Sequence, residues 1–122
     1  MERAKYEYHV DMSSIMNQKT GKVIPNRLVV FSKDMDADYV VVSDRYSLVH
    51  NRDVVDAVRK VVSGLGYNIE FEYTNLFDRG GIMFHDFVTT SEYEINGTKL
   101  KAKFSAVNSY NASTLCGVSI SF

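Results

Sequence analysis

Apolar and polar residues alternate along most of the chain, which is the pattern of β-strands with one buried face. This alternation predicts strands at residues 5–10, 27–32, 67–77, 82–95, 98–107 and 113–122, and one bent strand or two strands at 39–49. In the first segment Tyr6, Tyr8 and Val10 are expected to share one face. The pattern alone therefore describes a β-rich chain.

The segment 67–77 has the clearest alternation between aromatic and acidic residues. We expect its apolar positions to face the core and its polar positions to face solvent. The expected inward set is Ile69, Phe71 and Tyr73, and the expected outward set is Glu70, Glu72 and Thr74. On this interpretation the two glutamates form part of a solvated sheet edge.

Turn signals separate the expected strands. Residues 16–22 are polar around Gly21 and predict a hairpin tip, and residues 33–38 and 78–81 predict further turns. Asn96-Gly97 is a strong two-residue hairpin signal, because both positions tolerate positive φ.

One segment has helical periodicity instead, and it predicts a main helix at about residues 52–63. Asn51 is a suitable N-cap, and Gly64 and Gly66 supply the end. The expected buried stripe is Val54, Val55, Ala57, Val58, Val61, Val62 and Leu65. Valine is a mediocre helix former, so this helix should depend on docking against a sheet.

This order of strands, one helix and further strands predicts an α+β fold. We expect an antiparallel sheet with the helix packed on one face, in a single domain over residues 1–122. A chain of 122 residues with 45% hydrophobic residues is long enough to build one core.

Charge and cysteine content narrow the function classes. The net charge of −1 gives no overall attraction to nucleic acid or acidic membranes, so any basic surface must be local. The single cysteine, Cys116, excludes an internal disulfide and lies in an apolar pattern, so we expect a buried, unreactive thiol. With no apolar run of membrane-spanning length and a polar start, we expect a cytoplasmic protein that contacts no membrane.

The sequence contains no recognisable catalytic motif. His9, His50 and His85 are far apart, and no ligand spacing supports a metal site. We therefore expect no catalytic residue, no metal and no cofactor, and a protein that is not an enzyme.

Lys99, Lys101 and Lys103 alternate along one expected strand and so share a face. Such a row could follow a phosphate backbone. A two-residue turn at Asn96-Gly97 would instead place Glu94 opposite Lys99 and Glu92 opposite Lys101. Lys103 would then be opposite Thr90 and unpaired, so both the solvated and the phosphate-binding interpretations stay open.

The chain has eight tyrosines and seven phenylalanines but no tryptophan. Proteins that bind single strands stack bases on exposed aromatic rings beside basic residues. Tyr46 beside Arg45, Tyr110 in "NSYN", and Tyr6 and Tyr8 beside Lys5 are the candidates. The alternative is that these tyrosines pack with their hydroxyls at the rim of the core.

Two segments carry a resemblance. "YVVVSDRYSLVHNRDVVDAV" at 39–58 contains a V-x-D-R-Y-x-x-V-x-N run before a helix, and "NSYNAST" at 108–114 follows a hairpin. Together, over about residues 39–122, they resemble a shortened form of the domain of unknown function 932 family of phage and plasmid proteins. The chain departs from that family at Asn111-Ala112, where the family has Asp-Gly. The resemblance implies a phage or mobile-element origin and a link to recombination or single-stranded DNA.

Two hypotheses about function follow. The first is single-stranded DNA binding or annealing, with a binding set of Arg45, Tyr46, Lys99, Lys101, Lys103, Asn108 and Tyr110. The second is an anti-CRISPR-like inhibitor that binds a host defence protein complex, since an aromatic-rich, near-neutral surface suits a protein partner. Exposed sheet edges would also allow a homo-oligomer.

Overall fold

The structure is a computed structural model, which describes residues 4–113 and 116–121. Its strands form two antiparallel sheets rather than one. The first sheet contains β1 (Asp11–Met16), β2 (Val23–Ser32) and β3 (Ala37–Ser43) in that order. The second contains β4 (Ile69–Phe77), β5 (Ile82–Ile95), β6 (Thr98–Ser109) and β7 (Gly117–Ser121), also in chain order.

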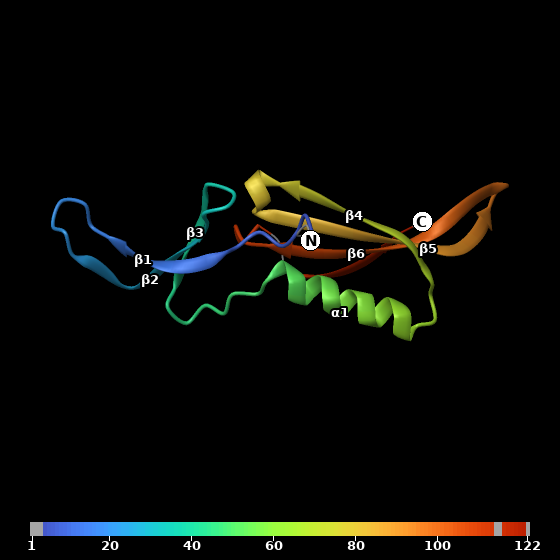
Figure 1. The fold of residues 1–122 in the computed structure, drawn as a ribbon, viewed down its shortest axis with the longest axis horizontal. Helices are drawn as coiled ribbons and strands as arrows, with labels where there is room; N and C mark the ends of the chain where they lie inside the picture. Colours follow the sequence, from blue (N-terminus) through green and yellow to red (C-terminus); the bar gives the residue numbers. More distant parts are fainter. Residues whose placement is uncertain (1–3, 114–115, 122) are drawn as a thin grey trace.

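One α-helix, α1 (Asn51–Gly64), connects the two sheets in sequence, and a short 3-10 helix, η1 (Asp78–Gly80), joins β4 to β5. Figure 1 shows an elongated molecule in which α1 runs along the four-stranded sheet. The β1–β2 hairpin projects at one end and the β5–β6 hairpin at the other (Figure 1). The predicted α+β fold, an antiparallel sheet with one packed helix, is confirmed, and the division into two sheets is added to it.

The predicted strands at 27–32, 67–77, 82–95 and 98–107 are present, and β7 covers part of the predicted strand at 113–122. In the segment 39–49, β3 ends at Ser43, so the expected second or bent strand at 44–49 is absent, and β1 was not predicted. Residues 5–10 form no strand, because this segment passes between two cores. Tyr6 packs in the core under α1, whereas Val10 packs in the core of the three-stranded sheet. Because Tyr6 and Val10 pack into different cores, the side chains of this segment do not alternate between the two faces of one sheet.

The β5–β6 hairpin turns at Asn96-Gly97, as predicted. Both residues have positive φ, 52° and 81°, and Ile95 pairs with Thr98. Left-handed φ at both central positions is the geometry that matches the twist of the flanking strands.

The helix is present but differs in detail from the prediction. His50 is the N-cap, and Asn51 is the first helical residue, with its side chain buried. The buried face consists of Asn51, Val54, Val55, Val58 and Val62. Ala57, Val61 and Leu65, which we expected to be buried, are exposed, the last two at 51% and 62%, since α1 covers β5 and β6 but stops short of β7.

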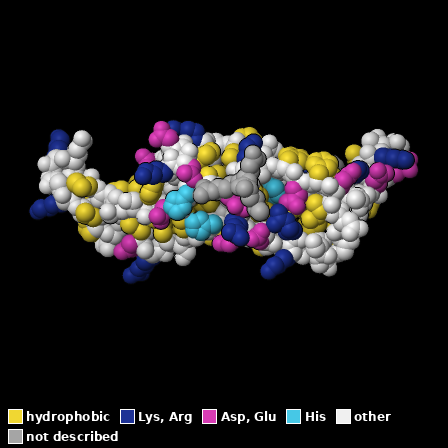
Figure 2. All heavy atoms as spheres, viewed as in Figure 1, with side chains coloured by type: hydrophobic (Ala, Val, Ile, Leu, Met, Phe, Trp, Pro, Cys, Tyr) yellow, Lys and Arg dark blue, Asp and Glu magenta, His cyan; other side chains and the backbone are white. Residues whose placement is uncertain are grey.

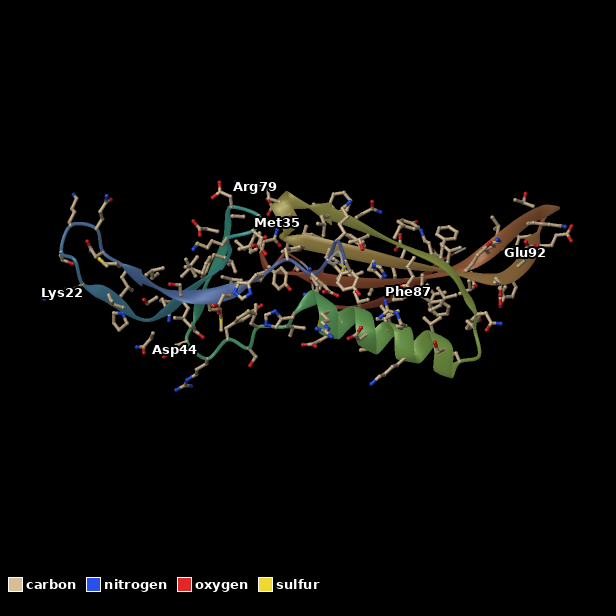
Figure 3. The ribbon with its side chains drawn as sticks, viewed as in Figure 1. Lys22, Met35, Asp44, Arg79, Phe87 and Glu92 are labelled. Carbon is tan, nitrogen blue, oxygen red and sulfur yellow. The ribbon has the colours of Figure 1, made fainter. Side chains whose placement is uncertain are left out.

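The main core lies between α1 and the four-stranded sheet. Phe87 points from β5 toward α1 and is fully buried (Figure 3). It packs with Met83, Phe104 and the helix valines. None of the helices in the described part of the chain is long and apolar enough to cross a membrane.

Candidate functional site

The four-stranded sheet has two faces, and only one of them packs against α1. Met83, His85 and Phe87 of β5 face the helix, so the residues between them face the other way. Paired residues of adjacent strands lie on the same face of the sheet, so the register of β4, β6 and β7 shows which of their residues share each face of β5. We call this second side the outer face: Phe71, Tyr73, Asn75, Phe77, Ile82, Phe84, Asp86, Val88, Lys103, Ser105 and Val107.

The predicted orientation of β4 is wrong from Phe71 to Thr74, although Ile69 packs against the core as expected, and Thr74 contacts the buried His85 instead of facing solvent. A bulge between Ile69 and Phe71 shifts the alternation by one residue. Phe71 and Tyr73 therefore lie on the outer face, and Glu72 turns toward α1. A bulge leaves no signature in the apolar pattern, so periodicity could not find it.

Aromatic rings line the outer face along β4 and β5. Phe71 and Tyr73 stack, with ring centroids 6.1 Å apart and planes at 26°. Phe77 packs edge-on against Phe84 at 5.8 Å. Phe71, Tyr73 and Phe77 are 51%, 38% and 53% exposed, and hydrophobic side chains gather over β4 in Figure 2.

A polar group lies at the centre of the outer face. The hydroxyl of Ser105 donates to the buried carboxylate of Asp86. The Lys103 Nζ lies 3.9 Å from Asp86 Oδ2. A hydrogen bond to Asp86 raises the pKa of the Tyr73 hydroxyl, and burial acts in the same direction. Lys103, predicted to be unpaired, thus has an acidic neighbour.

The lysine row follows β6 as predicted, and Glu94 and Glu92 are opposite Lys99 and Lys101. A second bulge, between Val88 and Glu92, places Val88 rather than Thr90 opposite Lys103. Lys101 forms its ion pair across the sheet with Glu70, and this partner raises the pKa of the Lys101 ammonium. The row is therefore largely neutralised, and only a modest positive charge borders the aromatic rings.

Asn108 and Tyr110, both in the predicted binding set, are buried at 2% exposure. The Asn108 amide donates to the carbonyl of Val49 at 3.0 Å and to Asn51 Oδ1 at 2.9 Å. The backbone N–H of Asn51 donates to the Tyr110 hydroxyl at 2.7 Å. These two side chains fix the start of α1 against β6 and have no surface for direct contact with a partner.

Tyr110 also joins the two sheets. Its ring stacks on Tyr39 of β3 at 5.9 Å and meets Tyr8 edge-on at 6.1 Å. The Tyr8 hydroxyl accepts from the Asn51 amide and donates to the carbonyl of Gly80. Burial raises the pKa of Tyr110 to about 12, although the hydrogen bond from Asn51 acts in the opposite direction. This cluster is a structural junction rather than a set of stacking residues.

Hydrogen bonds at η1 also connect the two sheets beside this junction. The Tyr39 hydroxyl donates to the carbonyl of Arg79 at 2.8 Å, and the Arg79 guanidinium donates to the carbonyl of Asp36 at 3.0 Å. Figure 3 shows Arg79 beside the turn that carries Met35. Gly80 has φ of +86°, and an added Cβ would lie 2.9 Å from the Tyr8 ring, so only glycine fits there.

Arg45 and Tyr46 follow β3 and belong to the three-stranded sheet, not to the outer face. Arg45 is exposed, whereas Tyr46 is half-buried and packs against the core formed by Val10, Val30 and Tyr110. The structure therefore separates the predicted binding set into three places: this turn, the buried junction and the lysine row.

An ionic group on the helix side was not predicted; its His85 is buried, whereas Glu72 and Arg59 are partly exposed. His85 Nε2 lies 2.7 Å from Glu72 Oε1, and the same oxygen accepts from Arg59 at 2.7 Å. The Nδ1 of His85 contacts the Thr74 hydroxyl at 2.7 Å. Burial acts to raise the pKa of Glu72, but the hydrogen bonds from Arg59 and His85 outweigh it and lower that pKa. Glu70 and Glu72 thus have separate partners and do not form an acidic pair.

Cys116 is exposed and free, so the prediction of a buried thiol is wrong. Among the described residues no group of three or more His, Cys, Asp or Glu side chains is arranged to hold a metal ion.

Two grooves flank α1. One, of about 430 Å³, lies between the N-terminal segment and the start of the helix and is lined by polar groups that include His9, His50 and Arg52. The other, of about 400 Å³, is apolar and lies between α1 and β7.

Comparison with known proteins found no match among family models, curated proteins or solved structures.

Proposed function

We propose that the protein binds single-stranded nucleic acid, with single-stranded DNA as the leading ligand, on the outer face of the four-stranded sheet. The observation that carries this proposal is the line of exposed aromatic rings, Phe71, Tyr73 and Phe77, next to Lys103. An open antiparallel sheet with aromatic rings on it presents bases with flat surfaces on which to stack.

Stacking, rather than charge, supplies most of the affinity in this proposal. Base–aromatic stacking contributes about 1–3 kcal/mol per base. The positive charges near the face are few, and Lys101 and Lys103 already have acidic neighbours. If Lys99, Lys101 and Lys103 each neutralise one phosphate, the logarithm of the affinity falls with the logarithm of salt with a slope of about −2.

No family model matches the chain, so the resemblance of residues 39–122 to the domain of unknown function 932 family stays a hypothesis, and the proposal rests on the outer face. In this proposal Arg45 and Tyr46 lie outside the stacking surface, and Asn108 and Tyr110 position β6 from within.

Fluorescence anisotropy of labelled oligo-dT at low salt tests the proposal. Phe71→Ala and Phe77→Ala each remove one exposed ring and should weaken binding by roughly 5- to 150-fold, the equivalent of one stacked base. Lys103→Glu should also weaken binding and make the salt dependence shallower. Val41→Ala is the matched control, because Val41 is 54% exposed on the other sheet.

Lack of any oligo-dT binding by the wild-type protein at low salt would overturn the proposal. Binding that is unaffected by Phe71→Ala, Phe77→Ala and Lys103→Glu would also overturn it, since another surface would then bind the strand. If the wild-type protein does not bind oligo-dT, the exposed outer face favours the other class of partner, a host defence protein complex. A pull-down with the purified complex tests that alternative.

A further inference from the structure

The free edge of β7 is unlike the other edge of its sheet. All five residues of β7 are exposed, and none of them is charged or a proline. The opposite edge, β4, carries Glu70 and Glu72 and a bulge. Charges and bulges are what proteins use to keep a sheet edge from pairing with another strand. The β7 strand has neither.

The side of β7 that faces the helix is also open. Phe104 pairs with Ile120 and Ala106 with Val118, so these two β7 side chains share the face that packs against α1. Val118 and Ile120 are nevertheless 52% and 61% exposed. An apolar groove of about 400 Å³ lies between Val118 and the helix, lined by Val49, Ala57 and Val61 among others.

We propose that a second copy of this chain covers the edge, with its β7 antiparallel to the first β7 across a two-fold axis perpendicular to the sheet. Centring the pair on Ser119 brings Val118 opposite Ile120 of the partner subunit. Ser119 then lies opposite Ser119 of the partner subunit. The two four-stranded sheets become one continuous sheet of eight strands.

The chain itself has the properties that the edge requires of its occupant. The added strand must be short, must expose apolar side chains at every second position, and must have a free edge of its own. The β7 strand, with sequence GVSIS, has all three properties.

The symmetry also buries the open apolar strip. A two-fold axis perpendicular to the sheet keeps both copies of α1 on the same side. Val118 and Ile120 from both copies then form one cluster, next to the exposed Val61 that lines the groove beside Val118 in each copy. No charged residue lies on β7, so two identical edges do not repel each other.

This proposal does not depend on nucleic acid binding, and the first experiment contains none. Size-exclusion chromatography with light scattering should show a concentration-dependent dimer of the wild-type chain. Val118→Lys, which places a charge in the strip, should shift the protein to the monomer with an unchanged circular dichroism spectrum. Val41→Lys is the matched control, because Val41 is 54% exposed against 52% for Val118, and it should leave the dimer intact.

Crosslinking tests the register. In a Cys116→Ser background, Ser119→Cys should form a disulfide-linked dimer on mild oxidation, because the two positions face each other across the axis. Ser13→Cys, on an exposed position of β1, should not. A monomer at all concentrations, or a dimer that survives Val118→Lys, overturns the proposal. A dimer in which Ser119→Cys fails to crosslink overturns the antiparallel register centred on Ser119.

Discussion

The two faces of the four-stranded sheet use the same residue types in different ways. On the side of α1, aromatic rings such as Phe87 are buried, and the Glu72 carboxylate is paired with Arg59 and lies within hydrogen-bond distance of His85. On the outer face, Phe71 and Phe77 are half-exposed, and Asp86 is held by Ser105 and Lys103. The difference indicates that the first face maintains the fold, whereas the second has aromatic surface available to a ligand.

The largest contrast should appear when a ring is removed from each face. Phe87→Ala leaves a cavity under α1 and should lower the free energy of unfolding by about 3–5 kcal/mol. Phe77→Ala removes a ring that is 53% exposed and should cost less than about 1 kcal/mol. Urea denaturation followed by circular dichroism measures both. Similar losses for the two variants would mean that the outer face is also part of the core.

The sequence predicts the two faces of some strands correctly and those of β4 incorrectly. The alternation and the Asn96-Gly97 turn predict β5 and β6 well, because a long hairpin is specified by local signals. The orientation of β4 could not be predicted, since the bulge at Glu70 depends on pairing with Val88 and Thr89. The bulge at Glu70 therefore reversed the predicted inward and outward orientations of the side chains at residues 71–74.

Tertiary contacts account for the other errors. Asn51 has the local sequence of an N-cap, but its amide is needed by Tyr8 and Tyr6, so the helix begins one residue earlier than a capping argument predicts. Tyr110 lies in a polar cluster that resembles an exposed loop, yet it fills the junction between the sheets. Neither fact could be predicted from spacing, because both depend on which sheet each segment joins.

Replacing one asparagine on each face should give the second-largest difference in the free energy of unfolding. Asn108→Ala leaves the Val49 carbonyl and Asn51 Oδ1 without this donor in a buried site. The free energy of unfolding should fall by about 1–3 kcal/mol. Asn75→Ala, at an exposed position of the outer face, is the control and should change it by less than about 0.5 kcal/mol. A negligible effect of Asn108→Ala in thermal or urea melts would contradict the structural role of the junction.

The balanced carboxylate under α1 predicts a dependence on pH. The folded-state pKa of Glu72 is lowered below the unfolded value, so its contribution is fully present above about pH 4.5 and is lost as the pH falls through the folded pKa. Arg59 of α1 and His85 of β5 face this carboxylate, and Asp56 shares Arg59. Glu72→Gln should cost about 1 kcal/mol at pH 7 and flatten the stability profile between about pH 5 and pH 3. Urea midpoints across that range measure it, and an unchanged profile would show that this carboxylate is not coupled to folding.

At Lys103 we expect a small effect on stability and a larger effect on binding. Its side chain is 35% exposed, and its Nζ lies 3.9 Å from Asp86, which keeps the hydroxyl of Ser105 as a partner. Lys103→Gln should therefore lower the free energy of unfolding by only about 1 kcal/mol or less. The same variant should weaken oligo-dT binding and reduce the salt slope by about 0.7, because one phosphate contact is lost.

Lys60→Gln, on the exposed side of α1, serves as the charge-matched control and should leave both the slope and the affinity unchanged. Equal losses of affinity for Lys103→Gln and Lys60→Gln would mean that the strand responds to net charge rather than to the outer face.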